Sequence, residues 1–180
     1  MHNPECATCF VKGRFMLEDL FTKPILILGC GNPLLGDDGF GPEVVDHLHR
    51  MGHLPDTAAA IDVGTSIGDI LFDFLLSPRK PPHLFIVDAV CQPGRNPGDL
   101  FEVAIEDVPS NKSVDFSLHQ FPSVNLLREL RESGAMQIRI LVVQVNEIPQ
   151  VVQPGLSQEV REAIPRACEW ILDKLAPLAV

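Results

Sequence analysis

The sequence predicts a three-layer α/β/α domain built on a five-stranded, mostly parallel, twisted sheet. Short apolar runs alternate along the chain with stretches in which apolar side chains recur at helical spacing. The first run, Ile25–Leu28, is apolar throughout, which is typical of a strand buried on both faces of a parallel sheet. A length of 180 residues is enough to fill one core of this kind.

The expected elements follow in the order β-α-β-α-β-β-α-β-α. Strands are predicted at residues 25–28, 58–63, 84–87, 99–105 and 138–145. After the first strand, Pro42 suits a first helical turn, and apolar residues recur up to Met51. Ser66 is a candidate N-cap of the second helix, which buries Ile67 and Phe74. A third helix turns Val124, Leu127 and Leu130 inward, and residues 157–175 form the last helix.

Connection rules limit how these strands are arranged. Right-handed crossovers place the first strand between the second and the third. The alternating pattern of residues 99–105 is typical of a strand near an edge. We predict the strand order 2-1-3-5-4, with the fourth strand antiparallel. The ligand crevice is then expected where connections from adjacent strands leave toward opposite faces.

The composition of the chain argues against nucleic-acid binding and membrane insertion. The chain carries 24 acidic and 14 basic residues, a net charge of −10, which argues against a nucleic-acid partner. No apolar stretch approaches the ~20 residues that span a bilayer, and no secretory signal is visible, so membrane insertion is not expected. Five scattered cysteines, at 6, 9, 30, 91 and 168, fit a reducing cytoplasm better than a disulfide framework.

Two carboxylates and one imidazole form the candidate site. Asp38 lies in the glycine-rich loop after the first strand, Asp88 directly follows residues 84–87, and His119 lies in the polar stretch Glu106–Phe121. Because the first and third strands are expected to be parallel neighbours, Asp38 and Asp88 should meet at one edge of the sheet. Two oxygens and one nitrogen suit a borderline-soft divalent metal.

The glycine-rich loop also allows a nucleotide-binding interpretation. Gly29-Cys-Gly31 after a strand resembles part of a dinucleotide fingerprint, but the sixth position is Leu34, and Pro33 removes a donor. Asp37 and Asp38 would also repel a phosphate at the helix start. Alone, these two acids could simply complement the helix dipole, which would not explain Asp88.

The chain resembles the nickel–iron hydrogenase maturation endopeptidases. The resemblance rests on four motifs, which are Gly29-Cys-Gly-Asn-Pro-Leu-Leu-Gly-Asp-Asp-Gly-Phe-Gly41, Asp62-Val-Gly-Thr65, Leu84-Phe-Ile-Val-Asp-Ala-Val90 and Ser117-Leu-His-Gln120. It implies a phosphorylase/hydrolase-like fold and assigns Asp38, Asp88 and His119 as the catalytic and metal-contacting triad. The Ser117 motif is similar to that of the archaeal group serving deazaflavin-coenzyme-reducing hydrogenases.

The resemblance also implies an activity. The substrate would be a nickel–iron hydrogenase large-subunit precursor that already carries nickel, and the enzyme would remove its C-terminal tail in the cytoplasm. Nickel would belong to the precursor rather than to the enzyme. The family is conventionally grouped with aspartyl proteases, although metal-directed cleavage is a different mechanism. A non-proteolytic nickel chaperone using the same triad, and a nucleotide-binding module, remain alternatives.

The first residues depart from the family pattern. We predict an N-terminal extension over residues 1–23 and a single protease domain over residues 24–180. Met16 could be an alternative start, or Phe15, Leu17, Leu20 and Phe21 could form a short apolar helix against the domain or a partner.

Overall fold

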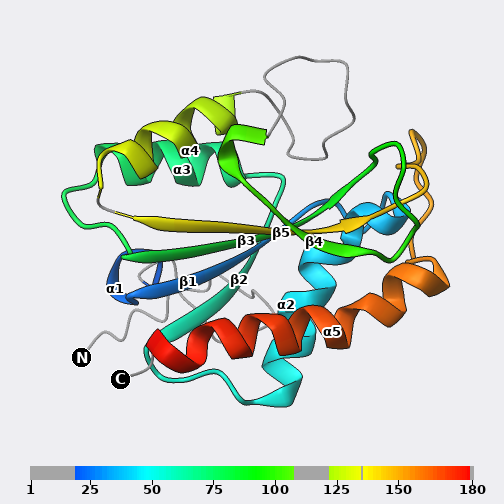
Figure 1. Ribbon diagram of the computed structural model, residues 1–180, viewed down its shortest axis with the longest axis horizontal. Helices are drawn as coiled ribbons and strands as arrows, with labels where there is room; N and C mark the ends of the chain where they lie inside the picture. Colours follow the sequence, from blue (N-terminus) through cyan, green and yellow to red (C-terminus); the bar gives the residue numbers. More distant parts are fainter. Residues whose placement is uncertain (1–18, 108–121, 135, 179–180) are drawn as a thin grey trace, which may run out of the picture.

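The computed structural model describes residues 19–107, 122–134 and 136–178, which form a sheet between two layers of helices (Figure 1). The sheet has five strands in the order β2-β1-β3-β5-β4. β1 pairs in parallel with β2 and β3, β3 pairs in parallel with β5, and β4 is antiparallel to β5. The predicted fold class, strand order and orientation of the fourth strand are therefore confirmed.

The strands lie close to their predicted positions. Their bounds are β1 (Ile25–Cys30), β2 (Ala58–Gly64), β3 (His83–Val90), β4 (Leu100–Val103) and β5 (Gln137–Gln144). Every residue of β1 is buried, as its uninterrupted apolar sequence predicts. β4 is shorter than predicted because its pairing with β5 ends at Val103, after which Ile105–Asp107 form a 3₁₀ turn, η2, that contacts α4.

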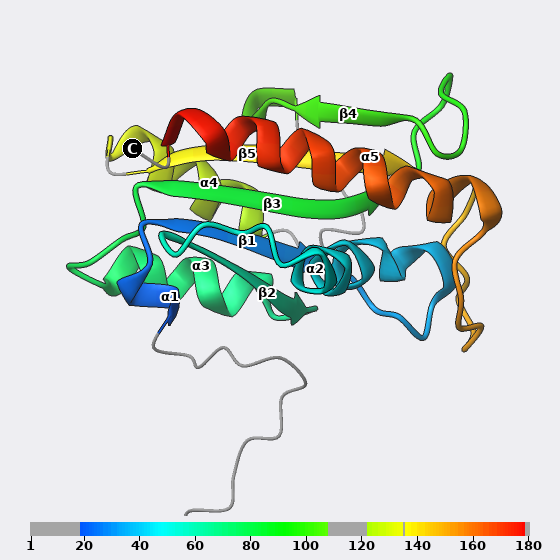
Figure 2. The same cartoon turned by 90° about the horizontal axis from the view of Figure 1, so that it is seen from below.

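Helices cover both faces of the sheet (Figure 2). α3 (Ile67–Leu76) and α4 (Pro122–Glu132) pack on one face, while α2 (Phe40–Met51) and α5 (Gln158–Leu175) pack on the other. Alternate residues of β1 serve the two faces, with Leu26 and Leu28 in the first core and Ile25 and Ile27 in the second. This double burial is the reason that the central strands read as continuous apolar runs.

The helix predictions hold with small changes. Val124, Leu127 and Leu130 of α4 are buried, as predicted. Ser66 occupies the N-cap position of α3, but its side chain makes no capping hydrogen bond there. A 3₁₀ turn, η3 (Ala176–Leu178), follows α5. No helix within the described ranges is both long and apolar enough to cross a bilayer.

A short helix, α1 (Asp19–Thr22), precedes the first strand. Leu20 is buried in the core on the α3 side, and the ring of Phe21 meets that of Phe74 edge-on at 5.6 Å between centroids. Of the apolar residues predicted to form a helix there, these two therefore pack against the domain. Phe15 and Leu17, like Cys6 and Cys9, lie outside the described residues, and the boundary at residue 23 stays a prediction.

Candidate active site

The loop after β1 folds back over the end of its own strand, and glycine makes this possible. Gly31 has a φ of +123°, and a Cβ there would collide with the backbone carbonyl oxygen of Asp38. The loop continues into a 3₁₀ turn, η1 (Gly36–Gly39), which contacts β3 and leads directly into α2. Asp38 is thereby delivered from β1 to the neighbouring strand β3.

Asp88 reaches the same region from a different position than the sequence predicted. It lies inside β3 rather than just after it, because β3 continues to Val90. Pairing of β3 with β1 ends at Val87, but β5 goes on pairing with Asp88, Ala89 and Val90. The strand thus extends beyond the first apolar run on one side only, which leaves Asp88 next to the end of β1.

Backbone amides hold both carboxylates. The amide of Asn32 donates to Oδ2 of Asp38 at 2.7 Å, and the amide of Ala89 donates to Oδ1 of Asp88 at 2.8 Å. Both aspartates are fully buried, although aspartate is rarely buried in proteins. Two buried carboxylates with fixed orientation at one sheet edge indicate a site rather than surface acids, since burial of a charge is costly.

Cys30, at the end of β1, indicates how closely the acids gather. Burial raises the pKa of its thiol well above the ordinary value, and the negative charges of Asp88, Asp62 and Asp38 raise it further. All three carboxylates therefore lie within electrostatic reach of one sulfur atom. The same shift keeps the thiol protonated, so Cys30 does not provide the thiolate that a cysteine protease needs.

Asp37 has a structural role that distinguishes it from its neighbour. Its Oδ1 accepts a hydrogen bond of 2.6 Å from the amide of Ser157, the N-cap residue of α5. This bond joins the loop after β1 to the start of the last helix, which lies 120 residues further along the chain. Asp38, by contrast, is held within its own loop by the amide of Asn32.

Gln144 is a supporting residue that the sequence prediction missed. It is buried at the end of β5, where its amide group accepts from the backbone amide of Gln92 at 3.3 Å and donates to the Gln92 carbonyl at 3.0 Å. Gln144 thus fixes the loop that follows β3 and Asp88. Its signal in the sequence was a polar residue after an apolar strand, which by itself does not identify a clamp.

His119, the third predicted site residue, lies outside the described residues. Among the residues that are described, no group of three histidine, cysteine, aspartate or glutamate side chains could hold a metal ion. The structure therefore brings Asp38 and Asp88 to one region and leaves the position of His119 a prediction.

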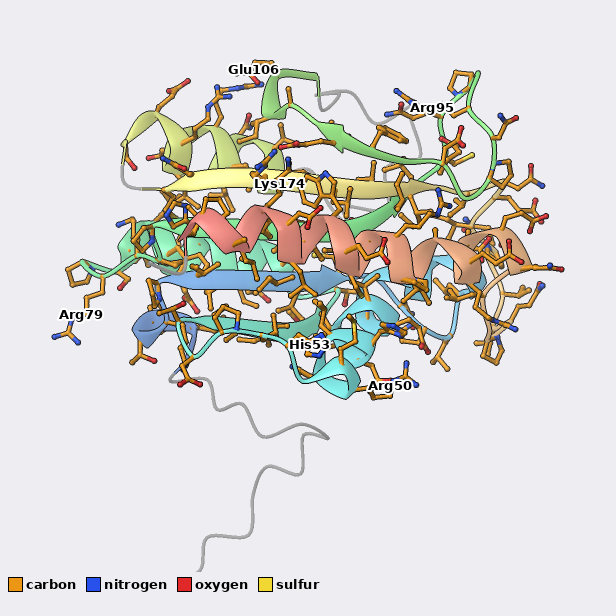
Figure 3. The ribbon with its side chains drawn as sticks, turned by 60° about the horizontal axis from the view of Figure 1, so that its bottom comes forward. Arg50, His53, Arg79, Arg95, Glu106 and Lys174 are labelled. Carbon is orange, nitrogen blue, oxygen red and sulfur yellow. The ribbon has the colours of Figure 1, made fainter. Side chains whose placement is uncertain are left out.

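Four cationic side chains of the described residues lie on separate elements. Arg50 lies on α2, Arg79 in the segment after α3, Arg95 in the loop before β4, and Lys174 on α5 (Figure 3). These four labelled residues therefore come from four separate helices and loops. The buried carboxylates of Asp37 and Asp38 occupy the approach to α2, where a dinucleotide phosphate would bind.

Known proteins are similar to this chain in fold and in sequence. A family model described as hydrogenase maturation protease matches residues 42–174. The coenzyme F420 hydrogenase subunit delta of Methanothermobacter thermautotrophicus is 35% identical over 159 residues, covering 86% of this chain and 96% of that protein. The hydrogenase 2 maturation protease of Escherichia coli is 33% identical over 153 residues, covering 84% and 90%. The solved structure of the Escherichia coli hydrogenase maturating endopeptidase HybD is 32% identical, with a TM-score of 0.63 and coverage of 85% and 92%.

The mixed five-stranded sheet of this chain is thus the fold of a solved endopeptidase, and a curated relative is a hydrogenase maturation protease. The chain belongs to the hydrogenase maturation protease family. The predicted family and the predicted role as an endopeptidase in hydrogenase maturation are confirmed.

Proposed function

We propose that this protein removes the C-terminal tail of a nickel–iron hydrogenase large-subunit precursor, and that nickel carried by the precursor directs the cleavage. The tail and the nickel are both parts of the substrate in this scheme. Asp38, Asp88 and His119 are the residues that contact the metal.

One observation supports this proposal above the others. Asp38 and Asp88 come from separate loops and strands, yet both are fully buried, both are held by backbone amides, and both act on the thiol of Cys30. Fixed carboxylate oxygens are suitable ligands for a divalent cation, and an imidazole from His119 would make the donor set suited to nickel. A cation brought by the substrate would also offset the cost of burying two negative charges.

The chemistry is hydrolysis of one peptide bond. Water adds to the carbonyl carbon, the C–N bond breaks, and the leaving nitrogen takes a proton. We assign the carboxylates to metal contact and orientation of the precursor, which differs from an aspartyl protease in which two carboxylates share a proton. Because the enzyme supplies three ligands, a precursor without nickel would lack the contact that aligns its tail.

The substrate class can be narrowed further. We infer that the precursor belongs to a hydrogenase that reduces a deazaflavin coenzyme, supported by the 35% identity to the coenzyme F420 hydrogenase subunit delta. We also infer that processing takes place in the cytoplasm. Cys30, Cys91 and Cys168 are all free thiols, which fits a reducing compartment.

A cleavage assay tests the proposal. Purified precursor is offered with and without nickel, and release of the tail is followed by mass spectrometry. We expect cleavage of the nickel-loaded form only. Asp38→Asn should slow cleavage at least about 100-fold, a loss of about 2.7 kcal/mol, because an amide is a poor ligand for a divalent cation.

Asp37→Asn is the matched control, since its amide oxygen can still accept the hydrogen bond from Ser157. This variant should process the precursor at close to the wild-type rate. Rapid cleavage of the nickel-free precursor, or a loss in Asp37→Asn as large as in Asp38→Asn, would contradict metal-directed cleavage.

A further inference from the structure

Exposed apolar side chains gather beside the candidate site. Within the described residues, the large hydrophobic side chains that stay exposed are Leu34, Phe72, Leu76, Val151 and Val152. Three of them, Leu34 at 53% and Val151 and Val152 at 70% each, belong to two segments that are far apart in the sequence and adjacent in space. We call these three residues the apolar patch. Exposed apolar side chains from neighbouring segments, unlike scattered single ones, are typical of binding surfaces.

Backbone contacts fix the two segments of the apolar patch together. The amide of Gln153 donates to the carbonyl of Leu34 at 2.8 Å, and Leu35 forms a parallel bridge with Gln153. Gly36 packs so closely on Pro149 that a Cβ at Gly36 would lie 3.2 Å from the proline ring. Both views show the segment after β5 running alongside the loop after β1 (Figures 1 and 2). The apolar patch is therefore held in place before any partner binds.

The apolar patch is also linked directly to the carboxylate of Asp38. The amide of Leu34 donates to Oδ1 of Asn32 at 3.0 Å, and the amide of Asn32 donates to Oδ2 of Asp38 at 2.7 Å. One loop thus carries an exposed apolar side chain and, two hydrogen bonds away, a proposed metal-contacting oxygen. The apolar patch is therefore tied through Asn32 to the proposed metal contact.

We propose that the apolar patch docks an apolar segment of the hydrogenase precursor and so holds the precursor over Asp38 and Asp88. This inference rests on the proposed function and adds the surface by which the enzyme recognises its protein substrate. The occupant is the precursor because Leu34 lies two hydrogen bonds from the carboxylate of Asp38, which the metal of the precursor must contact. Apolar contacts also add binding energy without placing a further charge beside the acidic side chains of Asp37 and Asp38.

The size of the apolar patch fits a substrate better than a second copy of the chain. Three partly exposed side chains offer on the order of 300 Å², whereas each partner in a stable complex buries about 800 Å². A small contact area allows the processed large subunit to leave after cleavage. The nickel contact supplies the remaining interaction.

The test compares apolar-to-polar variants on two surfaces. The double variant Val151→Ser/Val152→Ser removes the part of the apolar patch that lies on the segment after β5. This segment does not carry the proposed metal contacts. Phe72→Ser/Leu76→Ser is the matched control, because these residues are similarly exposed but lie on α3, on the other face of the sheet. Changes at such exposed positions have little effect on folding.

Cleavage of nickel-loaded precursor is then measured over a range of precursor concentrations. We expect KM to rise about tenfold in the Val151/Val152 variant, with kcat within about twofold of wild type, because only binding is weakened. The α3 control should match wild type in both constants. Leu34→Ser, on the other segment of the apolar patch, should also raise KM and provides a second test should the double variant fold poorly.

Two outcomes overturn the inference. An unchanged KM in both patch variants would show that the precursor does not use this surface. A wild-type dimer in sedimentation that dissociates in the Val151/Val152 variant would assign the apolar patch to a second copy of the chain. Failure of the wild-type enzyme to cleave any nickel-loaded precursor would instead refute the proposed function, so the two failures are distinguishable.

Discussion

Gly41 is the position at which a single methyl group should disturb both the fold and the site. It is the second residue of α2, where alanine would ordinarily stabilise a helix by up to about 1 kcal/mol. Here a Cβ would lie 2.6 Å from the carbonyl oxygen of Val87 and would also meet the backbone nitrogen and oxygen of Cys30. Those atoms belong to β3 and β1, which cannot move without disturbing the sheet.

The expected loss for Gly41→Ala follows from these two opposing effects. Overpacking against rigid neighbours costs about 3 kcal/mol, and the helix propensity of alanine returns about 1 kcal/mol. We therefore expect the free energy of unfolding to fall by about 2 kcal/mol, which corresponds to a decrease in Tm of roughly 4–8 °C for a domain of this size. The start of α2 should also shift away from β3, and Asp38 with it.

Urea unfolding and the cleavage assay together measure this effect. Gly52→Ala is the control, because Gly52 has a φ of +65° but no atom within 4 Å of the added Cβ. That variant should lose about 1–2 kcal/mol through backbone strain alone and keep its cleavage rate. Gly41→Ala should lose both stability and activity. A Gly41→Ala protein as stable as wild type would refute the close packing of α2 on β1 and β3.

Other substitutions test separate parts of the molecule. Asp88→Asn and His119→Ala should each abolish release of the tail in the mass-spectrometric assay, because each removes a proposed nickel contact. Cleavage near the wild-type rate in either variant would argue against the triad. Asp37→Ala removes the acceptor for the Ser157 amide and should lower the free energy of unfolding by about 1–3 kcal/mol in urea titrations, an effect that Asp37→Asn should largely avoid. The hydrogen bond from Arg139 lowers the pKa of Glu102 below its ordinary 4.5, so this carboxylate stabilises the fold above that pH and stops doing so as the pH falls through its folded-state pKa. Glu102→Gln should therefore cost less than about 1 kcal/mol at pH 7, since the pair is partly exposed, and less again at pH 3; an equal loss at both pH values would contradict this.

The glycine-rich loop illustrates how much of the site could be predicted. The sequence showed Asp38 in the loop after the first strand and Asp88 at the end of the apolar run of the third. Parallel pairing of these two strands was enough to expect the two acids in one region. It could not separate the roles of Asp37 and Asp38, which are adjacent and chemically identical. Their difference depends on Ser157, whose amide reaches Asp37 only after α5 has packed beside α2.

The predicted end of β3 was wrong for a similar reason. A run of apolar residues appeared to stop at Val87, because Asp88 is charged, yet the strand continues to Val90. The end of a strand is decided by its pairing partner, and β5 supplies partners for three more residues. Gln144 was missed because a clamp is defined by the loop it holds, which no local pattern reveals.

The sequence by itself determined the layers, the strand order and the family, because apolar periodicity, crossover handedness and short motifs are local or follow general rules. Only the tertiary structure decided which acid the Ser157 amide holds, how far β3 runs, and that the segments of Leu34 and Gln153 lie side by side. Each of these features depends on contacts between residues more than 50 positions apart. Such contacts are fixed by the packing of the whole domain, which no segment of the chain specifies alone.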